Sequence, residues 1–310
     1  LILAVLMVGS LAACGGTSDD TIRVGVVQLI QHEALDAATQ GFVDTLKAEF
    51  GDKVVIDVQN ASGEATNCTT IVNGFVSSNV DLIMANATAA LQAAREGTGT
   101  IPVLGTSITD YASALKIENW NGTVGGNVSG TTDLAPLDQQ AAIFTELFPD
   151  KKNVGMLYCS AEANSQYQVN EMTKLLEGLG YTVTPFAFTD TTNVTSVAQA
   201  ACDASDVIYI PTDNTAANNT EAIANVVIPA KVPVIAGEQG ICKGCGVATL
   251  SIDYYDLGVA TGKMAVKILK GEANIAEMPV EAAAGAVKMY NKTNCEALGL
   301  TIPDTYTVIE

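Results

Sequence analysis

The sequence predicts an α/β protein of two lobes, each built on a doubly wound parallel sheet. Segments rich in β-branched residues alternate with segments of helical spacing along most of the 310 residues. The alternation starts at residue 22 and restarts after residue 133. Such alternation implies parallel sheets that carry helices on both faces. Two successive sets imply two similar lobes around a cleft, a geometry that suits hinge closure.

The first set begins with a strand at 22–29, where the sequence IRVGVVQL is rich in β-branched residues. A helix follows at 35–50, because apolar side chains recur at helical spacing from Leu35 to Phe50. By the same criteria we expect strands at 53–59, 80–84, 102–106 and 122–127, and helices at 68–78 and 88–96.

The second set repeats this pattern. We expect helices at 137–148, 165–179, 194–201 and 218–228, and strands at 153–158, 182–188, 206–210 and 232–237. A last long helix at 255–270 is closed by Gly271. These elements predict a first lobe of residues 22–130 plus 252–279, and a second lobe of residues 131–251 plus 280–310.

The N-terminal segment predicts where the protein works. Residues 1–13, LILAVLMVGSLAA, are apolar but shorter than the roughly 20 residues that span a bilayer. They are typical of the apolar core of a secretory signal, and the sequence LAAC that ends at Cys14 resembles a bacterial lipobox. We expect 1–14 to be a signal peptide with a lipidated Cys14, and 15–21 to be a tether. The alternative is a buried N-terminal helix with a chance cysteine.

This interpretation predicts an extracytoplasmic protein that is held to the bacterial cell membrane only through its N-terminal lipid. The net charge of −19 argues against nucleic acid as a partner and against a basic membrane-binding face. With one histidine and a single CxxC at 242–245, the four ligands of a zinc site are missing. We expect no metal and no cofactor, and we interpret the CxxC as a local disulfide or as free thiols.

No enzyme motif fits the sequence. The stretch 258–264, GVATGKM, is one residue shorter than a phosphate-binding loop and lacks Ser or Thr after Lys263. Its spacing suits the interior of a helix. The sequence has no GxSxG motif, and nothing singles out a catalytic acid–base pair. We therefore expect a binding protein and not an enzyme.

In open α/β sheets, ligands bind at the carboxyl ends of the strands, so the turns that follow the strands are the candidate binding site. Polar side chains that can meet a small ligand occur at these turns in both lobes: Gln28, His32, Asn86, Thr88, Thr106, Ser107 and Asp110 in the first, and Glu162, Asn164, Ser165, Asp213, Asn214 and Glu238 in the second.

Several blocks at these turns resemble a known family. They are VGVVQLIQHEALD, ANAT, EANSQYQV, PTDNT, and a later GE followed by SIDYYDLG. In this order, across 22–279, they are similar to ABC-transporter substrate-binding proteins of the tryptophan/tyrosine-binding type. The resemblance implies a type I periplasmic-binding-protein fold, an amino acid as ligand, often aromatic, and the permease subunits of an ABC importer as partners. Glu33, where relatives often have proline, and the CKGC loop depart from the pattern.

An amino acid presents one carboxylate and one ammonium group. No arginine lies at the candidate turns. We therefore expect the carboxylate to meet backbone N–H groups at helix starts and hydroxyl groups, near Thr88 and Ser107. The ammonium group needs a carboxylate, which Asp213 or Glu238 supplies from the second lobe, or Asp110 from the first.

Each candidate has a plain structural alternative. The Asn, Ser, Thr and Asp candidates can serve as helix N-caps, and Glu238 can be a solvated loop acid. Trp120 and Tyr254 suit packing better than stacking on a ligand ring. Two functional alternatives also stay open: a sugar- or nucleoside-binding protein of the same fold, and a sensory protein of this fold that docks on a receptor.

Overall fold

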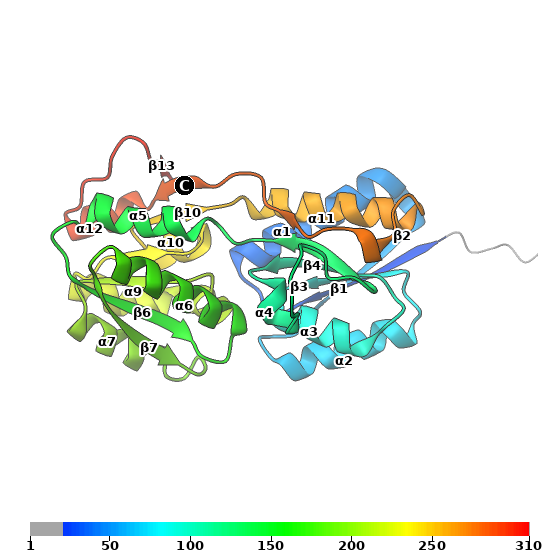
Figure 1. The fold of residues 1–310 in the computed structure, drawn as a ribbon, viewed down its shortest axis with the longest axis horizontal. Coiled ribbons are helices and arrows are strands. Elements are labelled where there is room, and N and C mark those ends of the chain that lie inside the picture. The colour runs from blue at the N-terminus through cyan, green and yellow to red at the C-terminus, as the bar shows by residue number, and fades with distance from the viewer. Residues whose placement is uncertain (1–20, 310) are drawn as a thin grey trace, which may run out of the picture.

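The computed structural model describes residues 21–309, which form two lobes joined side by side (Figure 1). The first sheet has the strand order β11-β5-β4-β3-β1-β2, and the second has the order β13-β12-β10-β9-β8-β6-β7. The strand pairs of the first sheet are parallel, and in the second sheet only β10 and β12 pair antiparallel. The predicted α/β fold with two sheets dominated by parallel pairs is confirmed.

The first sheet is buried at its centre, where β3 and β4 have no exposed residue. A parallel sheet covered on both faces requires such continuous apolar strands. Its strands are β1 (Ile22–Gln28), β2 (Val54–Asn60), β3 (Leu82–Asn86), β4 (Val103–Ile108), β5 (Val128–Thr132) and β11 (Glu281–Ala282).

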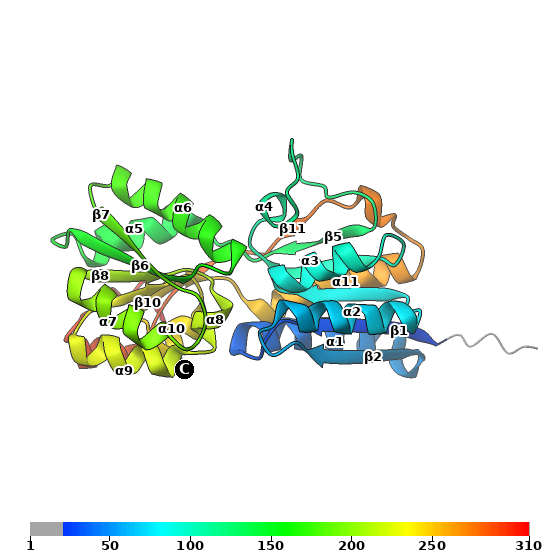
Figure 2. The same ribbon diagram turned by 90° about the horizontal axis from the view of Figure 1, so that it is seen from below.

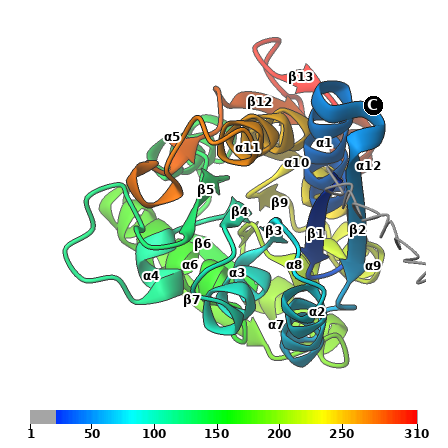
Figure 3. The same cartoon turned by 90° about the vertical axis from the view of Figure 1, so that its right-hand side faces the viewer.

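Helices cover both faces of the first sheet, as the end-on view shows (Figure 3). On one face lie α1 (Glu33–Phe50) and α11 (Tyr254–Leu269), and on the other lie α2 (Ala65–Ser77) and α3 (Thr88–Gly97). The short helix α4 (Tyr111–Leu115) and the 3-10 turns Gly51–Lys53 and Ile275–Glu277 complete this lobe.

α1 and α11 pack closely because glycine lies at their contact. A Cβ atom on Gly258 would lie only 2.0 Å from the backbone oxygen of Ala38. The stretch 258–264 is thus the interior of α11, as its spacing predicted, and not a phosphate loop.

The second lobe repeats the layered arrangement. Its strands are β6 (Asn153–Cys159), β7 (Thr182–Phe188), β8 (Val207–Ile210), β9 (Val234–Ala236), β10 (Ala248–Ser251), β12 (Val287–Tyr290) and β13 (Thr307–Val308). Its helices are α5 (Leu137–Leu147), α6 (Ala163–Gly178), α7 (Val194–Ala204), α8 (Asn214–Ala217), α9 (Thr220–Ala230), α10 (Gln239–Cys245) and α12 (Lys292–Leu298).

The fifth strand was predicted at the wrong place. It was expected at 122–127, but β5 occupies Val128–Thr132. Gly125 and Gly126 have φ angles of 80° and 62°, so the chain turns there and does not extend. The sequence VSGTT is small and polar, and only its position between β4 and β11 makes it a buried strand.

The sheets also place the lobe boundaries slightly differently from the expected limits at 130 and 279. β5 stays in the first sheet up to Thr132, and β11 pairs with it at Glu281–Ala282. The chain therefore passes between the sheets at 133–136, at 252–253 and at 283–286. Three neighbouring crossings are the connection that a hinge between two lobes needs.

The CxxC of the sequence lies in helix α10, not in a loop, and both of its cysteines are buried. The six cysteines of the described residues are free thiols, so the alternative of a local disulfide is wrong and that of free thiols holds. Cys14, the signal segment 1–14 and most of the 15–21 tether lie outside the described residues. Within 21–309, no helix has the length and apolar character to cross a membrane.

Candidate functional site

A small cavity lies between the two lobes, at the carboxyl ends of strands from both sheets. Its lining comprises His32, Leu35, Ser107, Thr109, Asp133, Asn164, Thr212, Asn214 and Tyr254. The free volume is about 10 Å³, close to what one water molecule needs. The lobes are therefore closed on each other.

Asp133 is the acid of this cavity. It follows β5 directly, and its side chain is only 3% exposed. One carboxylate oxygen accepts a hydrogen bond from the hydroxyl of Thr109 at 3.3 Å, and the other accepts one from Tyr254 at 3.0 Å. Burial raises the pKa of Asp133 to about 6. Because both partners are neutral hydroxyls, a cation in the cavity would find an uncompensated carboxylate.

Ser107 brings an unused hydroxyl to the same cavity. Its backbone has a φ of 56°, a left-handed conformation that is rare outside glycine. The side chain is 7% exposed and lines the cavity, and its Oγ is one of the few buried polar atoms of residues 21–309 without a hydrogen-bond partner. Strain combined with an unpaired polar group is typical of a ligand site.

The second lobe contributes amide groups to the cavity. The side-chain nitrogen of Asn164 donates to the backbone oxygen of Thr212 at 3.0 Å and to a carboxylate oxygen of Glu162 at 3.1 Å. Asn214 meets His32 of the first lobe, with 3.2 Å between Oδ1 and Nε2. Figure 2 shows α6 and α8, which carry these amides near their first turns, beside the first lobe.

The second-lobe acids that were expected to meet an ammonium group are occupied elsewhere. Asp213 accepts from the backbone N–H of Cys159 at 2.6 Å and from that of Ala216 at 2.8 Å, so it caps α8 and anchors β6. Burial, together with the charge of Glu162, raises the pKa of Asp213 to about 8. Asp213 does not line the cavity, and a ligand role would require it to release a helix cap.

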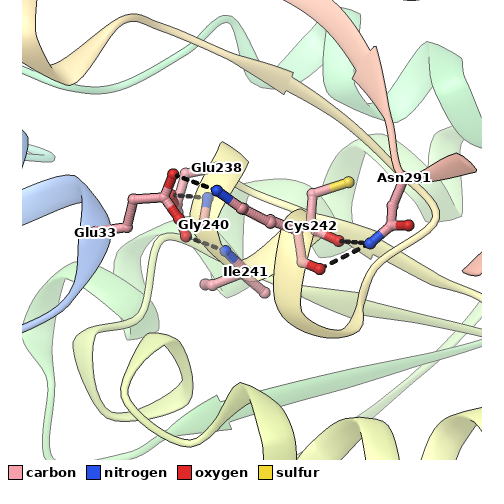
Figure 4. Close-up of polar contacts among 7 residues, drawn as sticks. Glu33, Glu238, Gly240, Ile241, Cys242 and Asn291 are labelled. Atoms are coloured by element: carbon pink, nitrogen blue, oxygen red, sulfur yellow. Dashed lines mark hydrogen bonds and ion pairs between the residues drawn. The ribbon is translucent and has the colours of Figure 1, made fainter. Parts of the chain in front are cut away.

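Glu238 is a cap of the same kind (Figure 4). Its two carboxylate oxygens accept from the backbone N–H groups of Gly240 at 2.6 Å and Ile241 at 2.5 Å, at the start of α10. The carboxylate is 2% exposed, and burial raises its pKa to about 7. Glu238 is thus not a solvated loop acid, and it borders a separate hollow beside the hinge rather than the central cavity.

Gln28 and Asn86 tie α1 to the first sheet. Gln28 accepts from the hydroxyl of Thr39 at 2.6 Å and donates to Asp36 at 2.7 Å, while Asn86 donates to the backbone oxygen of Leu35 at 2.8 Å. Neither side chain lines the cavity. They hold in place the helix from which Leu35 reaches the cavity.

The remaining candidates also have structural partners. Thr106 contacts the hydroxyls of Thr131 and Thr261 at 3.3 and 3.1 Å, which joins β4 to α11. Asp110 caps α4 by accepting from the backbone N–H of Ser113 at 2.7 Å. Thr88 is the buried first residue of α3, and the fully buried Ser165 lies next to Asn164. None of these four lines the cavity.

Sequence reasoning missed Asp133, Thr109, Thr212 and Tyr254 as cavity residues. The signal for Asp133 was present, since a polar residue directly follows a strand in the TTD sequence. Placing the fifth strand at 122–127 hid it, because the strand ends at Thr132. Tyr254 was assigned to packing, but its hydroxyl serves the cavity acid.

The family model for "ABC transporter substrate binding protein" matches residues 23–309. The chain belongs to this family. The substrate-binding proteins of ABC importers are binding proteins and not enzymes, they work outside the cytoplasm, and they pair a small-molecule ligand with permease partners. A curated relative, the "Tyrosine-binding protein" of Clostridioides difficile (strain R20291), is 31% identical over 281 residues, which cover 90% of this chain and 81% of the relative.

Two solved structures show which arrangement the lobes have in this substrate-binding protein. The ABC domain from Streptococcus pneumonia in complex with L-Trp is 34% identical, with a TM-score of 0.88 over 93% of this chain and 100% of that one. The ligand-free, open structure of a substrate-binding protein with adhesive properties from Clostridium difficile is 32% identical, with a TM-score of 0.71 over 94% and 99%. At similar identity and coverage, this chain matches the L-Trp complex better than the open structure, in keeping with the closed lobes seen at the cavity.

Proposed function

We propose that this substrate-binding protein captures a free L-amino acid, aromatic by preference, by closure of its two lobes and delivers it to an ABC importer. The observation that carries the proposal is the buried carboxylate of Asp133, which faces the interlobe cavity and whose partners among the described residues are neutral. An ammonium group is the cation of an amino acid, and its attraction to a carboxylate is strong in a site that excludes water.

The rest of the zwitterion has partners in the first lobe as well. The unpaired hydroxyl of Ser107 lies two residues from Thr109, which contacts Asp133, so a carboxylate next to the bound ammonium group meets a donor there. Backbone N–H groups at helix starts can add to it. Asn164 and Asn214 of the second lobe line the same cavity and would lie beside the ligand side chain.

Lobe motion is part of the proposal. The closed cavity has about 10 Å³ of free volume, so a ligand enters only after the lobes separate. Tyrosine, named for one relative, and the L-Trp in the similar solved structure support an aromatic amino acid.

The test compares ligands that differ by one charge. Isothermal titration calorimetry of the purified protein should detect one-to-one binding of L-tryptophan or L-tyrosine. Tryptamine lacks the carboxylate and indole-3-propionate lacks the ammonium group, and each should bind about 100-fold more weakly, because a buried partner is left unpaired. Binding of a sugar or a nucleoside, with none of the amino acids, would contradict the proposal.

We further propose that Cys14 carries a lipid that tethers the protein to the cell membrane. The lipobox-like LAAC sequence after an apolar segment supports this. Expression with radiolabelled palmitate should label the wild-type protein, whereas Cys14→Ser should remain unlabelled and appear in the medium. A label that persists in Cys14→Ser would argue against this anchor.

A further inference from the structure

Two hydrogen bonds join the lobes at the cavity: Gln168 of α6 donates to the hydroxyl of Thr109 at 3.3 Å, and His32 contacts Asn214. His32 precedes α1 of the first lobe, and Asn214 begins α8 of the second. Their contact, Nε2 to Oδ1, measures 3.2 Å, and both residues line the cavity. The bond exists only while the lobes are closed, since opening moves the two sheets apart.

Glu162 determines which way the amide of Asn214 points. One oxygen of its carboxylate accepts from the backbone nitrogen of Asn214 at 3.0 Å and from the side-chain nitrogen at 2.7 Å. The other accepts from the backbone nitrogen and the hydroxyl of Thr215 at 2.8 and 2.7 Å. A carboxylate only accepts, so the NH₂ group of Asn214 faces Glu162 and the amide oxygen faces the first lobe.

The orientation of Asn214 then dictates the proton of His32. Because the facing atom is a carbonyl oxygen, Nε2 of His32 must be the donor. Burial lowers the pKa of His32, although the charges of Glu162 and Asp36 oppose this, so the ring is neutral with one N–H. That N–H points across the interface to Asn214.

We infer that Glu162 is a positioning residue for lobe closure: it presents the amide oxygen of Asn214 to His32, and the interlobe bond so formed retains the ligand. The inference rests on the proposed function for the identity of the ligand. Glu162 was a candidate ligand contact in the sequence, but it does not line the cavity. All of its hydrogen bonds go to the second lobe.

An exposed ion pair between the lobes supplies an internal control. Lys243 of α10 and Glu33 of α1 form an ion pair at 3.3 Å, but their side chains are 47% and 50% exposed. Exposed pairs of this kind contribute little to stability. The bond from His32 to Asn214 is partly buried, so its loss should matter more.

The experiment is a double-mutant cycle on ligand dissociation, measured by stopped flow with L-tryptophan. His32→Ala and Glu162→Ala should each raise the dissociation rate by about three- to tenfold, as expected for one lost hydrogen bond. The association rate should stay near the wild-type value, because the bond forms only after the ligand has entered. The double variant should dissociate no faster than His32→Ala alone, since both changes remove one bond.

Two further variants separate positioning from general damage. Glu162→Gln should recover most of the wild-type rate, because one amide oxygen can still accept from Asn214. Lys243→Ala should change the dissociation rate less than twofold. The inference would be overturned if the rise in dissociation rate of the double variant equalled the product of the rises in His32→Ala and Glu162→Ala. Slower association in either single variant would also overturn it.

Two more measurements complete the test. If the fast dissociation of the variants appeared with L-tyrosine but not with L-phenylalanine, these residues would recognise the ligand hydroxyl and would not hold the lobes, which would overturn the inference. Small-angle scattering of the ligand-free protein needs no amino acid, and His32→Ala should increase its radius of gyration. Failure of every amino acid to bind would reject the proposed function. The scattering experiment would still test the interlobe bond, and an unchanged radius of gyration in His32→Ala would overturn the inference.

Discussion

Asp133 and Asp213 both follow buried strands, β5 in the first sheet and β8 in the second, yet they do different work. Each lies at or just past the carboxyl end of a buried strand, and each is at most 3% exposed. A helix begins immediately after Asp213, and two backbone N–H groups take its oxygens. After Asp133 the chain runs through the crossing at 133–136 before α5 begins, so its oxygens meet two side-chain hydroxyls and its own backbone N–H.

The chain that follows an acid at a strand end determines the role of that acid in this fold. Where a helix starts at the next residue, the acid serves as its N-cap. Where the chain crosses between lobes, the acid caps no helix, has only its own backbone N–H as a backbone donor, and remains available to a ligand. The predictions below test this contrast.

The largest effect should come from Asp133→Asn. Loss of the charge removes the partner of the ligand ammonium group, and we expect the affinity for L-tryptophan to fall by about 100-fold or more. The fold should survive, since the amide oxygen of an asparagine can accept from one of the two hydroxyls while its NH₂ group donates to the other. Calorimetry measures the affinity and a thermal melt checks the fold. A change of less than threefold would remove Asp133 from the site.

Asp213→Ala should show the opposite profile. It deprives α8 of its cap and leaves the N–H of Cys159 unpaired, so the free energy of unfolding should fall by about 3 kcal/mol. The affinity of the molecules that remain folded should change by less than about threefold. Urea unfolding and calorimetry below the unfolding transition measure the two quantities. Lost binding in fully folded Asp213→Ala would restore the role first expected of this acid.

The pH dependence should separate the same two acids. Burial raises the pKa of Asp213 to about 8, so the folded state holds this proton more tightly than the unfolded chain, where the pKa is about 4. The stability of the ligand-free protein should therefore fall as the pH rises from 6.5 to 8. In this range His32 is already neutral. Glu238, whose pKa is about 7, lowers the stability in the same direction. Asp213→Asn should flatten that slope in urea unfolding series.

Asp133 should affect binding in the same series. Burial raises its pKa to about 6, so below pH 6 it is protonated and presents no charge to an ammonium group. The affinity for L-tryptophan should weaken as the pH falls from 7 to 5, and Asp133→Asn should bind with little pH dependence over that range. An equal pH dependence in wild type and Asp133→Asn would assign the effect to another group.

The smallest effect should come from Ser107→Gly. Glycine adopts the φ of 56° without strain, so the variant should gain up to about 1 kcal/mol of stability. Without the hydroxyl, the affinity should fall by about three- to tenfold. A thermal melt and calorimetry measure both changes. Unaltered affinity would show that the unpaired hydroxyl of Ser107 does not contact the ligand.

Much of the fold could be predicted from local pattern. The two periods of strands and helices are visible because buried parallel strands are continuous apolar runs and helices show 3.6-residue spacing. β5 could not be predicted in this way, because VSGTT has neither pattern. It forms a strand only because it lies between β4 and β11. That single error also concealed Asp133, because the site lies where the strand ends.

The candidate site was predicted in part. His32, Ser107, Asn164 and Asn214 were expected at the strand ends and do line the cavity. Gln28, Asn86 and Thr106 were expected for the same reason, but their side chains point to α1 or α11 and stabilise the packing of those helices. Successive residues of a strand face opposite sides, so a shift of one position exchanges a ligand contact for a packing contact.

The sequence by itself determined the two-lobed α/β architecture and the resemblance to amino-acid-binding relatives, because both depend on local periodicity and on short blocks of residues. Only tertiary packing determined which acid faces the interlobe cavity and that the carboxylate of Glu162 binds the amide nitrogen of Asn214. Those assignments depend on which backbone N–H groups lie within reach of each carboxylate once strands, helices and the two lobes are packed, and spacing along the chain does not contain that information.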